Sequence, residues 1–232
     1  MLQVNGLESG YGESMVVRDV GFAVEPGKVM CLMGRNGVGK TTLLKTIMGV
    51  VKAKRGTVRY AEKELVGAAP SLRARLGIGY VPQGREIFPQ LTVEENVLLG
   101  LEANRTPGRK SAVPTAIYER FPVLYEMRAR RGGDLSGGQQ QQLAFARALV
   151  SEPTMLLLDE PTEGIQPNIV QDIGVLIRKL REEGLAVLLV EQSIHFAKET
   201  ADDFMVLDKG TIVARGGIGE LSEQIIHRHL TV

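Results

Sequence analysis

A glycine-rich segment between an apolar run and an amphipathic segment constrains this chain more than any other feature. Residues 34–42 read Gly-Arg-Asn-Gly-Val-Gly-Lys-Thr-Thr and match the pattern G-x-x-x-x-G-K-[ST]. The apolar run 29–33 precedes them as a buried strand would, and 41–48 follow with helical periodicity. Glycines let successive backbone N–H groups point at phosphate oxygens, and the start of a helix adds partial positive charge. The segment therefore predicts a phosphate-binding loop, and a glycine-rich turn with an exposed lysine is the weaker alternative.

The residues of this loop are expected to surround the phosphates of a nucleoside triphosphate. They are Gly34, Arg35, Asn36, Gly37, Val38, Gly39, Lys40, Thr41 and Thr42. Lys40 is expected to reach the β- and γ-phosphates as a mobile cation. The Thr41 hydroxyl is expected to ligate Mg²⁺.

Two adjacent acids end a second apolar run. Asp159 and Glu160 directly follow residues 155–158, Met-Leu-Leu-Leu. Burying a carboxylate without a partner is costly, and a Mg²⁺ ion would offset that cost for Asp159. Glu160 would then orient or deprotonate an attacking water. A strand that simply exits into solvent is the alternative, but the phosphate-binding loop makes a hydrolytic site the better interpretation.

A second glycine cluster stands at the start of another expected helix. Ser136, Gly137 and Gly138 precede the helical pattern over 140–150, and serine and glycine at a helix start favour an anion site. One nucleotide rarely needs two γ-phosphate sites from one chain. The cluster therefore favours a nucleotide bound to another subunit, and a flexible turn is the alternative.

The remaining pattern predicts an α/β chain. The continuous apolar runs 155–158 and 186–190 are typical of strands covered on both faces, and 168–183 between them have one apolar helical face. A half-buried strand is expected over 18–24, and two short strands within 204–215.

The middle of the chain is expected to differ from this core. From about residue 83 to residue 150 the pattern predicts helices and no convincing strand. The expected helices cover 93–101, 113–121 and 139–150. The polar stretch 104–111, which contains Pro107 and Gly108, is expected to be a loop.

Composition excludes several classes of function. The 28 basic and 27 acidic residues leave a net charge of +1, so a polyanion is not expected as the main partner and no nucleic acid is predicted. The single cysteine, Cys31, is expected to be a buried thiol. No signal peptide and no apolar run long enough to cross a bilayer is apparent, so the chain is expected to be soluble and to reach a membrane only through a partner.

Leu135–Gln139 resembles the signature motif of ABC transporter ATPases. The motif stands in the family's order, between the glycine loop (Walker A) and 155–160 (Walker B), and the resemblance covers essentially the whole chain. It implies a P-loop NTPase fold of the ABC ATPase type. In that fold a parallel sheet is flanked by helices and joined by an N-terminal antiparallel β part. The resemblance also implies one nucleotide-binding domain over 1–232, a helical subdomain at about 84–150, and hydrolysis of ATP with Mg²⁺.

The resemblance assigns roles to further residues. Tyr11 resembles the aromatic residue that stacks on adenine, and Gln83 resembles the glutamine that senses Mg²⁺ and faces the membrane subunit. Gln192 stands where the family usually has a histidine that holds the γ-phosphate, and glutamine donates a hydrogen bond without carrying charge. His195 is expected to be a surface or capping residue. Gln166 replaces the usual aspartate. Both departures count against full hydrolytic competence at two equivalent sites, and the pairing of two different ATPases that the resemblance implies would tolerate such asymmetry.

More narrowly, the chain resembles the smaller ATPase of branched-chain amino-acid-type importers. Residues 81–88, 91–96 and 190–192 carry that likeness. Residues 159–167 and the run Gln139–Gln142 resemble the urea-importing branch, so urea is expected ahead of branched-chain amino acids.

This likeness implies partners and a location. The partners are a second ABC ATPase, with a heterodimer favoured over a homodimer, two membrane permease subunits and, indirectly, a periplasmic or extracellular solute-binding protein. The expected location is the cytoplasmic face of the bacterial inner membrane. The alternatives are a soluble ABC-type ATPase of translation, repair or iron–sulfur assembly, and a nucleotide-binding regulator that does not hydrolyse ATP.

Overall fold

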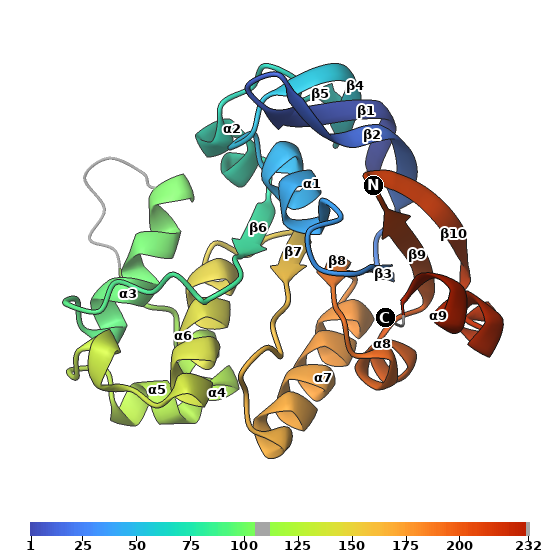
Figure 1. The fold of residues 1–232 in the computed structure, drawn as a ribbon. Coiled ribbons are helices and arrows are strands. Elements are labelled where there is room, and N and C mark those ends of the chain that lie inside the picture. The colour runs from blue at the N-terminus through green and yellow to red at the C-terminus, as the bar shows by residue number, and fades with distance from the viewer. Residues whose placement is uncertain (105–111, 231–232) are drawn as a thin grey trace.

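The chain folds around two β-sheets (Figure 1). The computed structural model describes residues 1–104 and 112–230. One sheet has four strands in the order β2-β1-β4-β5, and the other has six in the order β10-β9-β3-β8-β7-β6. The P-loop NTPase fold with an N-terminal antiparallel part is confirmed.

The four-stranded sheet is antiparallel and lies over helix α1. Its strands are β1 (Leu2–Tyr11), β2 (Ser14–Val24), β4 (Ala53–Tyr60) and β5 (Lys63–Glu64). Alternate residues of β1, including Leu2 and Val4, are fully buried and pack with Leu43 and Leu44 of α1 (Lys40–Ile47). The strand predicted over 18–24 is part of β2, which begins four residues earlier.

The six-stranded sheet is parallel except at its β10 edge. Its strands are β3 (Val29–Met33), β6 (Ile78–Val81), β7 (Met155–Asp159), β8 (Ala186–Val190), β9 (Asp203–Asp208) and β10 (Thr211–Gly217). The apolar runs predicted as core strands lie in β3, β7 and β8, and the two short strands predicted within 204–215 are β9 and β10.

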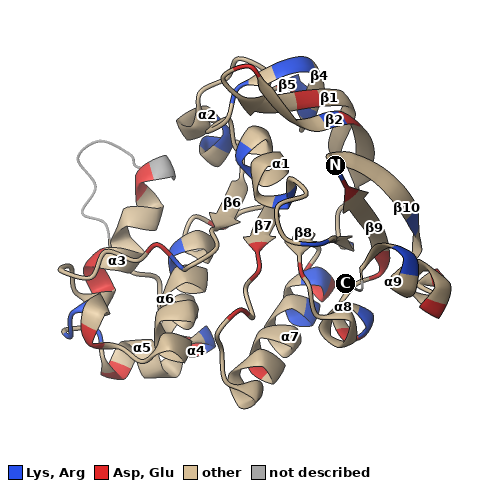
Figure 2. Cartoon of the chain, viewed as in Figure 1, with Lys and Arg blue, Asp and Glu red and all other residues tan. Residues whose placement is uncertain are grey.

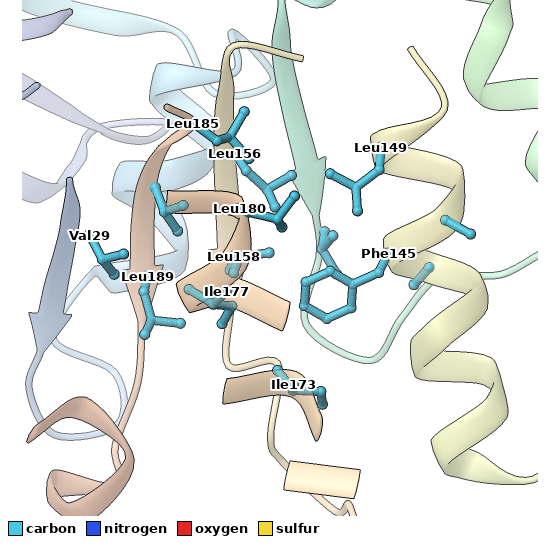
Figure 3. Close-up of a cluster of buried hydrophobic side chains, with 14 of the residues drawn as sticks. Val29, Phe145, Leu149, Leu156, Leu158, Ile173, Ile177, Leu180, Leu185 and Leu189 are labelled. Carbon is cyan, nitrogen blue, oxygen red and sulfur yellow. The ribbon is translucent and has the colours of Figure 1, made fainter. Parts of the chain in front are cut away.

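Helices cover both faces of this sheet, so its strands are apolar throughout. Leu157 of β7 lies in the cluster with α1, whereas its neighbours Leu156 and Leu158 face the helices α6 (Gly137–Leu149) and α7 (Pro167–Glu182). Figure 3 shows this second cluster, in which Phe145 of α6 and Ile177 of α7 converge on the sheet. The helix predicted over 168–183 is α7, displaced by one residue.

The described residues between β6 and β7 form helices, seen in green and yellow in Figure 1. The elements are α3 (Val93–Gly100), η1 (Leu101–Asn104), α4 (Thr115–Arg120), α5 (Pro122–Glu126), η2 (Gly132–Asp134) and α6. The helix expected over 113–121 is shorter, because Pro114 precedes its first turn and Pro122 disfavours helical geometry at the residue before it. The loop expected over 104–111 lies outside the described residues except for Asn104, which ends η1.

The remaining elements are α2 (Pro70–Arg75), α8 (Ile194–Thr200), η3 (Ile218–Glu220) and α9 (Glu223–His229). Cys31 in β3 is fully buried, as predicted, and its burial raises the pKa of the thiol far above the usual range. Among the helices of residues 1–104 and 112–230, none combines the length and apolar character needed to cross a membrane.

Candidate functional site

The glycine loop joins the end of β3 to the start of α1. Gly34 has φ 150° and Gly39 has φ 112°, both in the region that L side chains rarely adopt. A Cβ at Gly34 would lie 2.4 Å from the carbonyl oxygen of Leu207, so no larger residue fits there. Residues 35–37 are exposed, whereas Thr42 is buried at the beginning of α1. The loop therefore presents its tip to solvent while both of its ends are fixed in the core.

Lys40 is buried inside the loop, with 5% of its surface exposed. Its Nζ donates to the carbonyl oxygens of Gly34 at 2.9 Å and Arg35 at 3.0 Å. The same Nζ lies 3.4 Å from Oε1 of Glu160. The ammonium group thus occupies the centre of the loop, where its three donors face three oxygens.

Asp159 ends β7 and is fully buried. Its Oδ1 accepts a hydrogen bond from the Thr41 hydroxyl at 3.2 Å, and its Oδ2 accepts one from the Tyr80 hydroxyl at 3.4 Å. Burial raises the pKa of the Asp159 carboxyl, the Thr41 hydrogen bond opposes that rise, and the nearby charge of Glu160 adds to it. Figure 2 shows this acidic end of β7 at the carboxyl edge of the sheet.

The chemistry of these groups fits Mg²⁺. Thr41 and Asp159 supply a hydroxyl and a carboxylate oxygen next to each other, and hard oxygen ligands are the ones that Mg²⁺ prefers. Within the described parts of the chain no group of three or more His, Cys, Asp or Glu residues could hold a metal by itself. The site therefore suits an ion that takes one or two protein ligands and completes its shell with phosphate and water.

Glu160 lies at the centre of the polar cluster, with 8% of its surface exposed. Its Oε2 accepts hydrogen bonds from Nε2 of Gln192 at 2.7 Å and from Nε2 of Gln83 at 3.4 Å. Gln83 also donates to Oε2 of Glu163 at 2.9 Å. The backbone of Glu160 has φ 48°, which is uncommon for a residue with a Cβ and recurs at functional sites. Four of the predicted site residues, Lys40, Gln83, Glu160 and Gln192, thus meet around one carboxylate.

The second glycine cluster lies apart from the glycine loop, at the far end of α6 (Figure 1). Ser136 is the N-cap of α6: its Oγ accepts the N–H of Gln139 at 3.3 Å, and the Gln139 side chain accepts the N–H of Ser136 at 2.9 Å. A Cβ at Gly138 would lie 3.0 Å from Cγ1 of Ile169, so α6 approaches α7 closely here.

Three further residues that the sequence analysis singled out lie in other elements. Tyr11 ends β1 and is 55% exposed, so its ring is available to a ligand. His195 points into solvent and lies 3.4 Å from Glu199 one helical turn on, as expected of a surface residue. Gln166 is the N-cap residue of α7, and its side chain makes no capping hydrogen bond.

Sequence reasoning missed two residues of this region. Tyr80 contacts Asp159 as described, and Glu191, at the end of β8, is 3% exposed. An acid directly after a continuous apolar strand was the signal that singled out Asp159. The same signal stands at Glu191 after 186–190.

The family model described as ABC transporter matches residues 17–163, more than half of the chain. This chain belongs to the ABC transporter family. It is 42% identical over 213 residues to the high-affinity branched-chain amino acid transport ATP-binding protein BraG of Pseudomonas aeruginosa, covering 92% of this chain and 91% of that protein. It is 37% identical over 224 residues to a probable branched-chain amino acid transport ATP-binding protein, LivF of Archaeoglobus fulgidus, covering 96% and 94%.

A solved structure supports the same assignment. The dimeric post-hydrolysis ATP-binding cassette MJ0796, bound to ADP and Pi, superposes on this chain with a TM-score of 0.84 at 26% identity. The superposition covers 94% of this ABC ATPase and 99% of that chain. The chain is therefore an ATP-binding subunit of an ABC transporter, and its enzymatic activity is ATP hydrolysis coupled to transport.

We expect Asp159→Asn to raise the thermal stability of the nucleotide-free ABC ATPase. Because burial raises the pKa of this carboxyl, ionising Asp159 costs free energy in the folded chain that it does not cost in the unfolded chain. Removing that charge should add roughly 1 kcal/mol, or about 2–4 °C in Tm for a domain of this size. Scanning fluorimetry measures the shift. The gain should shrink as the pH falls, because protonation removes the same charge, and a lower Tm at neutral pH would contradict this account.

Proposed function

We propose that this ABC ATPase powers the import of branched-chain amino acids by hydrolysing ATP at the Glu160 cluster. The observation that carries the proposed site of hydrolysis is that one carboxylate, that of Glu160, contacts both Lys40 and Gln192. A candidate general base and a candidate phosphate-binding cation therefore share one buried cluster. Lys40 joins this cluster to the glycine loop, whose backbone N–H groups are proposed to bind phosphates.

The proposed roles follow from the chemistry of each side chain. Lys40 holds the β- and γ-phosphates, and the loop residues Gly34 to Thr42 surround them with backbone N–H groups. Glu160 orients or deprotonates the attacking water. Gln192 donates a hydrogen bond to the γ-phosphate, and Tyr11 stacks on the adenine.

The magnesium ion has its proposed ligands at the same edge of the sheet. Thr41 and Asp159 would hold it, and the side-chain oxygen of Gln83 would complete the protein's share. When bound, the ion neutralises charge on the phosphates. The Tyr80 hydroxyl keeps the Asp159 carboxylate oriented, since it donates to the oxygen that Thr41 leaves free.

Lys40 has to change partners when ATP binds. In the structure its ammonium faces the carbonyl oxygens of Gly34 and Arg35 and the carboxylate of Glu160. A phosphate in the loop offers this ammonium stronger, charge-assisted acceptors. ATP binding would therefore free Glu160 from its lysine and leave it held by Gln192 and Gln83 alone.

We expect two such ATPases to close head to tail over two nucleotides. Ser136, Gly137 and Gly138 would then cover a nucleotide held by the loop of the partner, which their distance from the chain's own loop supports. The helical segment 84–150, which carries this cluster, would move as one subdomain of the single domain 1–232. Two permease subunits would bind the ATPase pair at the cytoplasmic face of the inner membrane, and a solute-binding protein would deliver the solute to the permeases.

The solute is inferred from the relatives. Two curated relatives that cover more than nine-tenths of this chain are named as branched-chain amino acid transport ATP-binding proteins. The sequence motifs favoured urea as the solute, but neither of these relatives is named as a urea transporter. Urea remains the second candidate because of residues 159–167 and the run Gln139–Gln142. A non-transport ATPase is not favoured, since these relatives are named as transport proteins.

We expect the isolated chain to hydrolyse ATP slowly and to speed up when its partner ATPase and permeases are added. Gln192 and Gln166 stand where the resemblance to ABC ATPases implies a histidine and an aspartate, which favours a heterodimer with a partner that keeps those residues. Gln192→His should raise the basal rate about tenfold, or ~1.4 kcal/mol, because a protonated imidazole adds a charge beside the γ-phosphate. Steady-state phosphate release measures both effects. If the isolated chain already works at the full rate and Gln192→His changes nothing, a self-sufficient homodimer replaces this account.

A further inference from the structure

A buried carboxylate beside the Glu160 cluster has no part in the mechanism above. Glu191 directly follows β8, and its backbone N–H donates to the carbonyl oxygen of Leu32 at 3.2 Å. Its Oε2 accepts the backbone N–H groups of Gln192 at 2.9 Å and Ser193 at 3.1 Å. Its Oε1 accepts a short hydrogen bond from the Thr162 hydroxyl. Both oxygens of a side chain that is only 3% exposed are therefore engaged.

These contacts join the two loops that hold Glu160. Thr162 lies two residues after Glu160, and Gln192 lies one residue after Glu191. The Gln192 amide donates to Glu160 Oε2 at 2.7 Å, and the Glu160 N–H donates to the carbonyl oxygen of Val190 at 3.0 Å. The chain segments 160–162 and 191–192 thus form a closed ring, which two side-chain hydrogen bonds complete.

A purely structural role accounts poorly for this carboxylate. Helix α8 is already capped by Ser193, whose Oγ accepts the N–H of Phe196 at 3.2 Å, so Glu191 is not needed as its cap. Burial raises the pKa of the Glu191 carboxyl, whereas the hydrogen bonds from Thr162, Ser193 and Gln192 lower it. Burying the Glu191 carboxylate costs free energy. The charge-assisted hydrogen bonds that it accepts from Thr162 in one loop and from Gln192 and Ser193 in the other offset that cost and join the two loops.

We infer that Glu191 is a positioning residue for ATP hydrolysis, which with the Thr162 hydroxyl fixes the Gln192 amide against Glu160. The inference rests on the proposed function, because it takes Glu160 as the group that acts on the attacking water. The hydrogen bonds of Glu191 go to Thr162, Gln192, Ser193 and Leu32, and none of these residues belongs to the glycine loop 34–42. Its effect should therefore fall on turnover and leave nucleotide affinity nearly unchanged.

The test uses a matched pair of substitutions at Thr162, the residue whose hydroxyl donates to Glu191. Thr162→Val keeps the shape of the side chain and removes the hydroxyl, whereas Thr162→Ser keeps the hydroxyl. On the full chain, Thr162→Val should lower kcat about 10- to 100-fold, since small displacements of catalytic groups have effects of that size. The dissociation constant for a fluorescent ATP analogue should stay within about twofold. Thr162→Ser should recover most of the turnover.

A second pair of variants separates positioning from stability. Glu191→Gln should lower kcat like Thr162→Val, and the double variant should be no slower than the slower single one, because both break the same ring. Two results would contradict the inference. In one, Thr162→Val turns over as fast as the wild type. In the other, Thr162→Val and Thr162→Ser lose kcat to the same degree, and each loss is accompanied by a matching fall in Tm. Glu160→Gln, measured alongside, keeps the two hypotheses apart. If Glu160→Gln is also fully active, the proposed function fails; if only Glu160→Gln is inactive, Glu191 has no positioning role.

Discussion

Lys40→Ala is expected to reduce ATP hydrolysis about a thousandfold or more while the chain stays folded. The ammonium of Lys40 lies at the centre of the glycine loop and is the cation there that contacts Glu160. Without it, the loop loses the buried ammonium that is proposed to bind the β- and γ-phosphates. The charge that develops during phosphoryl transfer is then left without its cation. Steady-state phosphate release at saturating ATP measures the loss.

The control for this prediction is Lys40→Met, which keeps a flexible apolar side chain of similar length and removes the ammonium with its charge and its N–H donors. Both variants should lose activity to a similar degree, and circular dichroism should show unchanged secondary structure. Turnover near the wild-type rate in either folded variant would remove the argument that the glycine loop holds phosphates.

Glu160→Gln is expected to bind Mg-ATP and to hydrolyse it about 10²- to 10³-fold more slowly. Glutamine keeps the size of the side chain and can still accept a hydrogen bond from Gln192, but it is a far weaker base than a carboxylate. The ATP-bound state should then persist for the duration of the experiment. ATP-dependent dimers should therefore accumulate and be detected by size-exclusion chromatography.

The informative comparison for Glu160 is between binding and turnover. A fluorescent ATP analogue should bind the variant with an affinity close to that of the wild type. If Glu160→Gln fails to bind ATP, Glu160 has a structural or metal-binding role, and the general base has to be sought elsewhere in the cluster.

The core of this fold follows from local patterns in the sequence. β3, β7 and β8 are continuous apolar runs because both of their faces are covered, and such runs are visible without any tertiary information. The antiparallel strands β1 and β4 were not predicted individually. Their mutual pairing, and that of β1 with β2, contains register shifts that break the alternation of apolar and polar residues.

The site could be predicted from the sequence only in part, because some of its contacts join residues that are far apart along the chain. Lys40 follows β3, and Asp159 and Glu160 stand at the end of β7. These two strands belong to one parallel sheet with only β8 between them, and the carboxyl ends of such strands meet at one edge. The bonds from Gln192 to Glu160 and from Thr162 to Glu191 join residues 32 and 29 positions apart. Tertiary packing alone brings these side chains together, and no periodicity in the sequence indicates it.

ATP hydrolysis at this site is proposed to drive the import of a branched-chain amino acid. Uptake of labelled leucine, measured beside labelled urea in cells that lack this ATPase, tests it most directly. Restoring the wild-type chain should restore leucine uptake, and restoring Lys40→Ala at equal expression should not. Leucine uptake that persists without the chain or with Lys40→Ala, or urea uptake that alone follows the wild-type chain, would contradict the claim.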